Sequence, residues 1–102
     1  MLFYISGKIT GTDDYLERFA AAEEQLKVAG HVVINPAKMH SDWGDLVDYD
    51  ELMLLCFKEI DLADGVYQLA DWKDSKGACM EYGYAIAKDK IVIEEECVKE
   101  ER

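Results

Sequence analysis

The chain has 102 residues, half of them hydrophobic, and a single proline. This length suits one domain, and the apolar content is too high for a disordered chain. A formal net charge of −11 argues against DNA or RNA as a partner, because such binding needs many Lys and Arg residues to replace counterions. A small anion is still permitted, since backbone N–H groups at a helix N-terminus can hold one phosphate.

Residue patterns also argue against membrane, disulfide and metal roles. No apolar run approaches the roughly 18 to 20 residues of a membrane span, and residues 1–5 are too short for a signal-peptide core, so we expect a cytoplasmic protein. The three cysteines form no C-x-x-C pair, and we expect Cys56 and Cys79 to be small buried hydrophobes. His31 and His40 lack partners at ligand spacing, so neither a metal nor another cofactor is expected. A Ser-His-Asp arrangement stays open, although no G-x-S-x-G elbow is present.

Apolar periodicity divides the chain into alternating strands and helices. Helical spacing is clearest from Tyr15 to Ala29, where Gly30 is expected to end the helix, and from Tyr49 to Ile60. In chain order the pattern predicts a strand at 2–6, a helix at 15–29, a strand at 31–35, an irregular loop at 36–48, a helix at 49–60, a strand at 65–69, a polar loop at 70–74, a helix at 75–88 and a strand at 91–93. Such alternation predicts right-handed crossovers and an α/β fold with a parallel sheet between helices. Residues 94–102 are predicted to form an acidic tail.

Loops that follow parallel strands meet at one edge of the sheet, where ligands of such folds bind. Four of the nine lysines fall in these loops although the protein is acidic: Lys8, Lys38, Lys73 and Lys76. The pattern is compatible with a local anion site and equally with ordinary solvated loops.

The start of the helix at 75–88 carries the most information. Ser75 is a good N-cap, which alone explains its presence, and a phosphate at the same helix end would use the same hydroxyl. Gly77 lowers helix stability by about 1 kcal/mol relative to Ala, so its place in the first turn needs a reason, and close approach of a ligand is one.

Glu81 is predicted to share one helix face with small residues. It lies four residues after Gly77 and four before Ala85, with Ala78 beside them, which leaves open space next to the carboxylate. Most helix glutamates are merely solvated, but the spacing S-x-G-x-x-x-E-x-G makes that interpretation weaker here. Asp71 is a candidate second acid. Trp72 is either a stacking surface for a base or a cover over the core.

Two segments resemble the nucleoside 2-deoxyribosyltransferase superfamily: Tyr4-Ile5-Ser6-Gly7-Lys8-Ile9-Thr10-Gly11 and Ser75-Lys76-Gly77-Ala78-Cys79-Met80-Glu81-Tyr82-Gly83. The serine six residues before the glutamate is more similar to the deoxynucleoside 5′-monophosphate N-glycosidases than to the transferases. The whole chain also resembles a domain of unknown function common in phages and prophages. The likeness covers residues 2–93, and we expect residues 1–93 to form one domain. It implies a flavodoxin-like, three-layer sandwich with a Rossmann-like sheet in the order 2-1-3-4.

The resemblance also implies roles for individual residues. Glu81 would attack the anomeric carbon, Ser75 would hold a 5′-phosphate, and residues 4–7 would line the sugar pocket. A carboxylate suits this chemistry, because it can trap an oxocarbenium-like transition state as a glycosyl ester. The predicted catalytic residues are Glu81 and Asp71, and the predicted substrate-binding residues are Tyr4, Ser6, Gly7, Lys8, Asn35, Trp72, Ser75, Lys76 and Gly77.

The implied function is cleavage or exchange of the N-glycosidic bond of a 2′-deoxynucleoside or its 5′-monophosphate. Enzymes of the superfamily continue beyond the strand matching residues 91–93, and that extension often completes a neighbouring subunit's site. The alternative is therefore a non-catalytic nucleotide-binding or sensor module. By the same resemblance we expect a homodimer or larger homo-oligomer.

Overall fold

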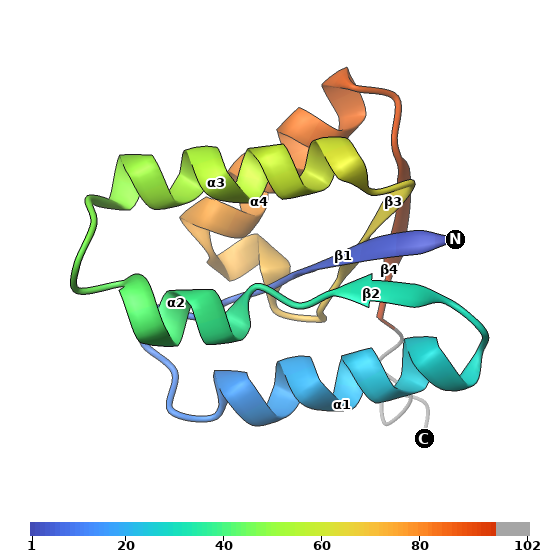
Figure 1. The fold of residues 1–102 in the computed structure, drawn as a ribbon, viewed down its shortest axis with the longest axis horizontal. Coiled ribbons are helices and arrows are strands. Elements are labelled where there is room, and N and C mark those ends of the chain that lie inside the picture. The colour runs from blue at the N-terminus through green and yellow to red at the C-terminus, as the bar shows by residue number, and fades with distance from the viewer. Residues whose placement is uncertain (96–102) are drawn as a thin grey trace.

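A computed structural model describes residues 1–95. It contains β1 (Leu2–Ser6), α1 (Tyr15–Val28), β2 (Val32–Ile34), α2 (Ala37–Trp43), α3 (Tyr49–Leu62), β3 (Gly65–Gln68), the 3-10 helix η1 (Trp72–Asp74), α4 (Lys76–Ala87) and β4 (Ile91–Glu94). Figure 1 shows the sheet between α1 on one side and α3 with α4 on the other. Glu94 ends β4, and the rest of the predicted tail after Glu95 lies outside the described residues.

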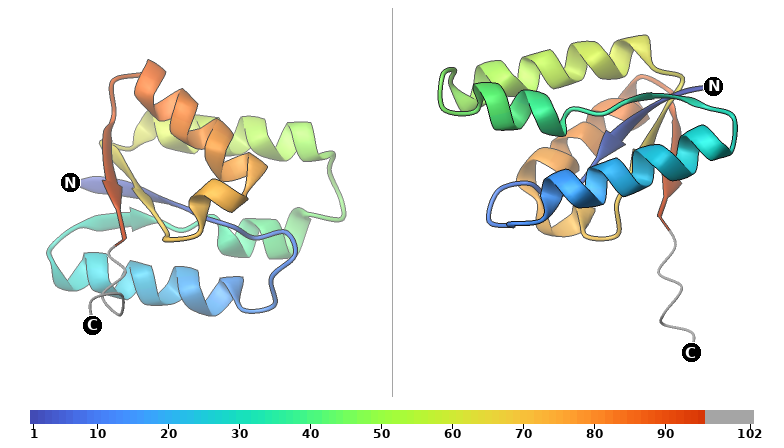
Figure 2. Two further views of the ribbon diagram at one scale, coloured as in Figure 1. Left: turned by 180° about the vertical axis from the view of Figure 1, so that it is seen from behind. Right: turned by 60° about the horizontal axis from the view of Figure 1, so that its bottom comes forward.

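The four strands form one parallel sheet in the order β2-β1-β3-β4, which confirms the predicted flavodoxin-like α/β arrangement. β1 is central, with Tyr4 paired to Ile34 of β2 and to Val66 of β3. The chain returns to the sheet through α1 on one face and through α3 and α4 on the other, as two views in Figure 2 show. All four strands therefore end at the same edge of the sheet.

Side chains of β1 alternate between two separate cores, as the period of two along a strand requires. Phe3 and Ile5 join the core under α1, which consists of Phe3, Ile5, Phe19, Ala22, Leu26, Ala37 and Leu69. Tyr4 points the other way, into the core under α3 and α4, which consists of Tyr4, Cys56, Ile60, Ala63, Val66 and Ala85. Ser6 shares the face of Tyr4 and is also buried.

Helix ends follow the predicted chemistry. Gly30 adopts a φ of +95°, and its N–H and that of His31 bond to the carbonyls of Lys27 and Leu26, which closes α1 in a Schellman arrangement. Asp48 and Glu51 form a capping box at the start of α3. Ser75 is the N-cap of α4.

The prediction of an irregular loop over 36–48 is wrong for its first half, which forms α2. The side chain of Asn35 accepts a hydrogen bond from the Ala37 N–H at 3.0 Å, and Lys38 pairs with Asp42 one turn later. Only Ala37 of α2 is fully buried, so the helix lacks the apolar periodicity that would have predicted it. Cys79 is likewise exposed rather than buried, whereas Cys56 is buried as expected.

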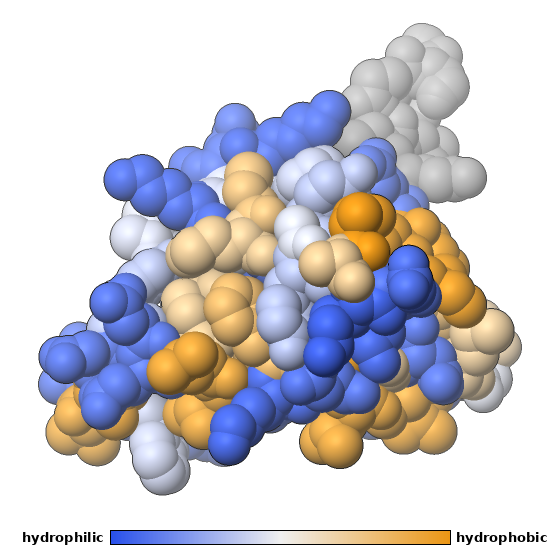
Figure 3. All heavy atoms as spheres, turned by 90° about the horizontal axis from the view of Figure 1, so that it is seen from above, coloured by the Kyte–Doolittle hydropathy of each residue, from blue (hydrophilic) through white to orange (hydrophobic). Residues whose placement is uncertain are grey.

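The surface over α3 and α4 mixes charged side chains with apolar ones (Figure 3). The exposed apolar residues of these helices include Leu54, Leu55, Leu62, Met80 and Ile86. Among residues 1–95 no helix is long and apolar enough to cross a membrane. The expected homo-oligomer stays a prediction.

Candidate active site

Glu81 is a buried carboxylate on the inner face of α4. Ala78, Glu81 and Ala85 are the buried residues of this helix, as the four-residue spacing predicts, and only 5% of Glu81 is exposed. The two alanines let α4 lie close to the sheet, so the longer Glu81 side chain reaches the strand below it. A carboxylate in such a place is unfavourable unless it is hydrogen-bonded.

Two hydroxyls of β1 meet this need. Tyr4 Oη donates to Glu81 Oε2 at 2.7 Å, and Ser6 Oγ donates to Oε1 at 2.6 Å. Tyr4 and Ser6 stand two residues apart, so they project from the same face of the strand toward α4. The period of the strand thus places one donor beside each carboxylate oxygen.

Burial raises the pKa of Glu81 from an ordinary value of 4.5 to about 7, although the hydrogen bonds from Ser6 and Tyr4 oppose this change. Burial, together with the neighbouring charge of Glu81, also raises the pKa of Tyr4 well above its usual value, so Tyr4 remains a donor. Near neutral pH, Glu81 is therefore divided between its acid and carboxylate forms. A carboxyl group in a cleft with a pKa near 7 is a candidate for proton transfer or nucleophilic catalysis.

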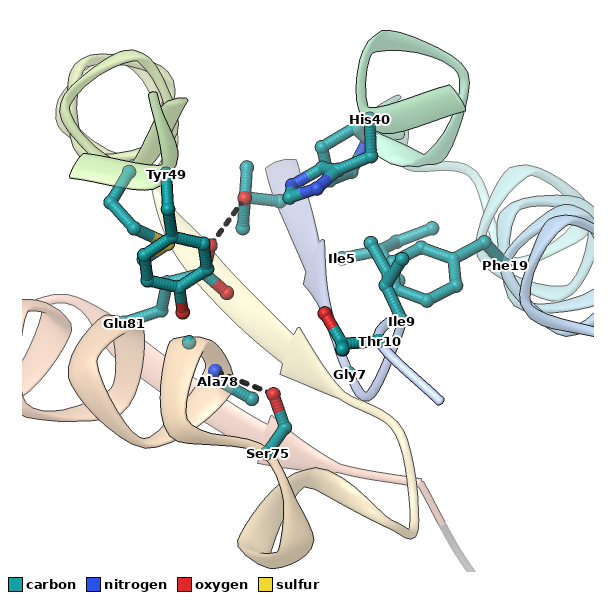
Figure 4. Close-up of a pocket in the computed structure, with 14 residues that line it drawn as sticks. Ile5, Gly7, Ile9, Thr10, Phe19, His40, Tyr49, Ser75, Ala78 and Glu81 are labelled. Atoms are coloured by element: carbon teal, nitrogen blue, oxygen red, sulfur yellow. Dashed lines mark hydrogen bonds between the residues drawn. The ribbon is translucent and has the colours of Figure 1, made fainter. Parts of the chain in front are cut away.

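The carboxylate lies at a pocket that contains about 360 Å³ of empty space, part of it open to solvent. Figure 4 shows residues of its wall, which come from β1 and the loop after it, from α1, α2 and α3, and from the first half of α4. They are Tyr4, Ile5, Gly7, Ile9, Thr10, Phe19, Pro36, His40, Tyr49, Met53, Ser75, Gly77, Ala78 and Glu81. The pocket thus occupies the carboxyl edge of the sheet, the edge at which α/β folds bind ligands.

The first turn of α4 forms one side of the pocket. Ser75 Oγ accepts a hydrogen bond from the Ala78 N–H at 3.1 Å, as an N-cap does. A Cβ at Gly77 would lie 3.0 Å from the Tyr49 hydroxyl, so glycine allows α3 to approach α4 closely here. The sequence suggested a ligand as the reason for this glycine, whereas in the structure the Tyr49 side chain provides one.

A second hollow, with a cavity volume of about 400 Å³, adjoins the first and shares Thr10, Tyr49, Ser75 and Gly77 with it. Its remaining lining residues are Lys8, Asp74 and Lys76. Two lysines and a helix N-terminus therefore border the outer part of the site, which favours an anionic group there.

The structure places four predicted site residues away from the walls of both hollows, namely Ser6, Asp71, Trp72 and Asn35, although Ser6 bonds to Glu81 beneath the pocket. Asp71 accepts from Arg18 Nη1 at 2.9 Å and from the Lys8 N–H at 3.3 Å, so it fastens two loops together. Trp72 is buried against Tyr82, with ring centroids 4.8 Å apart. The side chain of Asn35 bonds to Glu23 and to the start of α2.

Conversely, sequence reasoning missed several residues of the wall, above all Tyr49 and His40. His40 lies on α2, and its Nε2 is 3.6 Å from the Sγ of Cys56 on α3. His40 lies within the segment 36–48 and Tyr49 directly follows it, and the sequence predicted only an irregular loop there. In the described part of the chain, no group of three or more His, Cys, Asp or Glu residues could hold a metal ion.

Fold and site together define a flavodoxin-like α/β domain with a buried, hydroxyl-bonded carboxylate in a pocket at the carboxyl edge of its sheet. A family model described as a domain of unknown function, DUF4406, matches residues 1–94, and the chain belongs to that family. Neither a search of curated proteins nor a search of solved structures gives a match.

Proposed function

We propose that the protein binds a 2′-deoxynucleoside or its 5′-monophosphate and cleaves or exchanges the N-glycosidic bond, with Glu81 as nucleophile. The observation that carries the proposal is the Glu81 carboxylate in the pocket wall, held through both oxygens by Tyr4 and Ser6. Two bonds fix the orientation of the group, and orientation is what attack on one carbon atom requires. The resemblance of the two segments around residues 4–11 and 75–83 to deoxyribosyl-transferring enzymes supports the same assignment.

In the proposed first step, one Glu81 oxygen attacks C1′ of the deoxyribose, and the bond between C1′ and the base nitrogen breaks. The base leaves with the electron pair and takes a proton from solvent, while a glycosyl ester forms on Glu81. Tyr4 and Ser6 steady the carboxylate before attack. With a pKa of about 7, an appreciable fraction of Glu81 is ionised at neutral pH and ready to attack.

The charge of the site and the connection between its two hollows support such a substrate. The outer hollow has a cavity volume of about 400 Å³, within the range of roughly 300 to 1,000 Å³ that small ligands occupy. In this hollow, Lys8, Lys76 and the start of α4 provide partners for a 5′-phosphate. A sugar beside Glu81 and a phosphate near Ser75 would therefore span the two connected hollows.

The test uses chromatography to measure release of free base. The substrates are the four deoxynucleosides and their 5′-monophosphates, each with and without an acceptor base. Glu81→Ala should abolish release, because among the described residues of the inner pocket wall only Glu81 carries a carboxylate that could form the ester. Glu24→Gln, an exposed position on α1, is the matched control and should retain wild-type turnover. Turnover by Glu81→Ala equal to that of wild type, or none by wild type on any substrate, contradicts the proposal.

A second candidate function, binding of a nucleotide without turnover, is favoured by the 5% exposure of Glu81, because an attacking carboxylate has to reach the substrate. Calorimetry distinguishes the two functions. A deoxynucleotide that binds and is recovered intact after long incubation favours the binding module. A deoxynucleotide that binds and loses its base favours the enzyme.

A further inference from the structure

The proposed reaction has a second half, and the pocket must supply a proton acceptor for it. Hydrolysis of the glycosyl ester requires water to lose a proton as it attacks C1′. Asp71, the second acid that the sequence suggested, is bonded to Arg18 and does not line the pocket. The acceptor therefore has to come from another part of the wall.

Four lining residues of the pocket carry titratable side chains: Tyr4, His40, Tyr49 and Glu81. Burial raises the pKa of both tyrosines above their usual value, so they stay protonated near neutral pH. Glu81 is occupied by the ester in this step. Among the described residues of the wall, His40 is thus the group suited to accept a proton near neutral pH.

His40 and Glu81 enter the pocket from two different helices, and the reaction needs groups on opposite faces of the sugar. In a double displacement, water attacks the face of the sugar opposite to the nucleophile, on the side that the leaving base has vacated. In Figure 4 the His40 side chain extends into the pocket from α2, whereas Glu81 reaches it from α4. The backbone bond from the His40 N–H to the Pro36 carbonyl at 3.0 Å fixes this residue one turn into α2.

We propose that His40 is the general base of the hydrolytic step, and this inference rests on the proposed function. Water donates a proton to the imidazole while its oxygen bonds to C1′. The bond between C1′ and the Glu81 oxygen breaks, and its electron pair restores the carboxylate. The imidazolium then returns its proton to solvent.

The surroundings of His40 are compatible with this role. Burial lowers its pKa below 6.5, so the ring is neutral at pH 7 and has a lone pair to offer. Cys56 has its pKa raised to about 12, mainly by burial, and therefore remains a thiol. When Nε2–H donates to this sulfur, 3.6 Å away, the lone pair of Nδ1 is left free to accept a proton.

The experiment uses the full chain and the substrate from which wild type releases base fastest. His40→Ala should show a burst of about one base per site, followed by a steady rate that is about 10²- to 10⁴-fold slower than that of wild type. Intact-mass measurement should find a deoxyribosyl adduct that is absent from Glu81→Ala. Sodium azide should restore turnover to His40→Ala, because an anionic nucleophile needs no base.

His31→Asn is the matched control, since His31 lies at the amino end of the sheet beside Met1, and it should behave as wild type. His40→Asn, whose side chain is also planar and polar, replaces His40→Ala if the latter fails to fold. An unchanged steady rate in the His40 variants, or a slow rate without burst and azide rescue, overturns the role of His40 and leaves the proposed function intact. Absence of base release by wild type overturns both proposals.

Discussion

β1 separates two regions of the molecule that differ in chemistry, because alternate residues of this one strand face each region. Its face toward α1 presents Phe3 and Ile5 to a core made of apolar side chains. Its face toward α3 and α4 presents Tyr4 and Ser6, which bond to Glu81. A single strand therefore supports a region built for stability and a region that can hold reactive groups.

The second region is the less favourable for folding. It buries a carboxyl group, and it also buries Gln68, whose amide atoms have no hydrogen-bond partner among residues 1–95. Burying polar groups in this way costs free energy that an apolar pair of residues would not. The comparison predicts that substitutions on the face of β1 toward α1 alter stability. Substitutions on its face toward α4 should alter reactivity more than stability.

Phe3→Ala should have the largest effect on stability. The ring is 1% exposed and packs against Gly65, where a Cβ would lie 2.8 Å from Phe3 Cε1. Removing a buried phenyl ring typically costs about 3 to 5 kcal/mol, a large part of the free energy of unfolding of a small domain. Urea denaturation measures this loss, and Phe3→Leu serves if the alanine variant does not fold.

Tyr4→Phe, one residue along the strand, is the matched comparison. It keeps the ring and removes only the hydroxyl bonded to Glu81, so about 1 to 2 kcal/mol should be lost while base release falls more strongly. The folded fraction of Phe3→Leu should keep its specific activity. Equal losses of activity in these two variants would contradict the separation of the two faces.

Glu81→Gln should change how stability depends on pH. The pKa of Glu81 is about 7 in the folded protein and about 4.5 when unfolded, so folding favours the protonated form. The free energy of unfolding of wild type therefore carries no penalty from this group below pH 4.5. The free energy of unfolding then falls by about 3 kcal/mol as the pH rises to about 7, because each unit of pKa difference corresponds to about 1.4 kcal/mol. Glutamine cannot ionise, so the Glu81→Gln variant does not lose this free energy of unfolding.

Urea denaturation of both proteins from pH 4 to pH 8.5 tests this expectation. Other titrating groups affect both proteins alike, so the difference between the two curves reports on position 81. Glu81→Gln should gain on wild type between pH 4.5 and 7 and keep a constant lead above that range. Parallel curves would show that Glu81 titrates normally and would weaken the view that its burial prepares it for reaction.

The fold was largely predictable because its elements carry strong local patterns. The amphipathic spacing over 15–29, Gly30 after it and the alternation of strands and helices led to the observed sheet, with the order also implied by the family resemblance. α2 could not be predicted, since a seven-residue helix with one buried residue has no measurable period. Boundaries shifted by one or two residues where strands end in loops, as at β2.

Site residues were predictable where the pattern of one helix is enough to place them. They were not predictable where side chains from two separate elements have to meet. Spacing along α4 was enough to predict Glu81 on a buried face and Ser75 at the helix start. Arg18 and Asp71 are 53 positions apart in the sequence, and no local pattern shows that the first binds the second. For the same reason the sequence could not place His40 and Tyr49 in the pocket, or Trp72 against Tyr82.

Substitution of Ser75, which belongs to the region toward α4, should have the smallest effect. It distinguishes the structural role of this residue from its proposed binding role. Ser75→Ala removes the cap on the Ala78 N–H and should cost about 1 kcal/mol in urea denaturation, and Ser75→Asp keeps a capping oxygen and should cost less. If a 5′-phosphate binds at this helix start, the negative charge of Ser75→Asp repels it, so this variant should favour deoxynucleosides over their monophosphates more strongly than Ser75→Ala does. The measurement is the ratio of kcat/KM for each deoxynucleoside and its monophosphate in wild type and both variants. Ser75→Ala should lose more stability, whereas Ser75→Asp should show the larger change in selectivity. If the change in selectivity instead follows the loss of stability, Ser75 is a helix cap and nothing more.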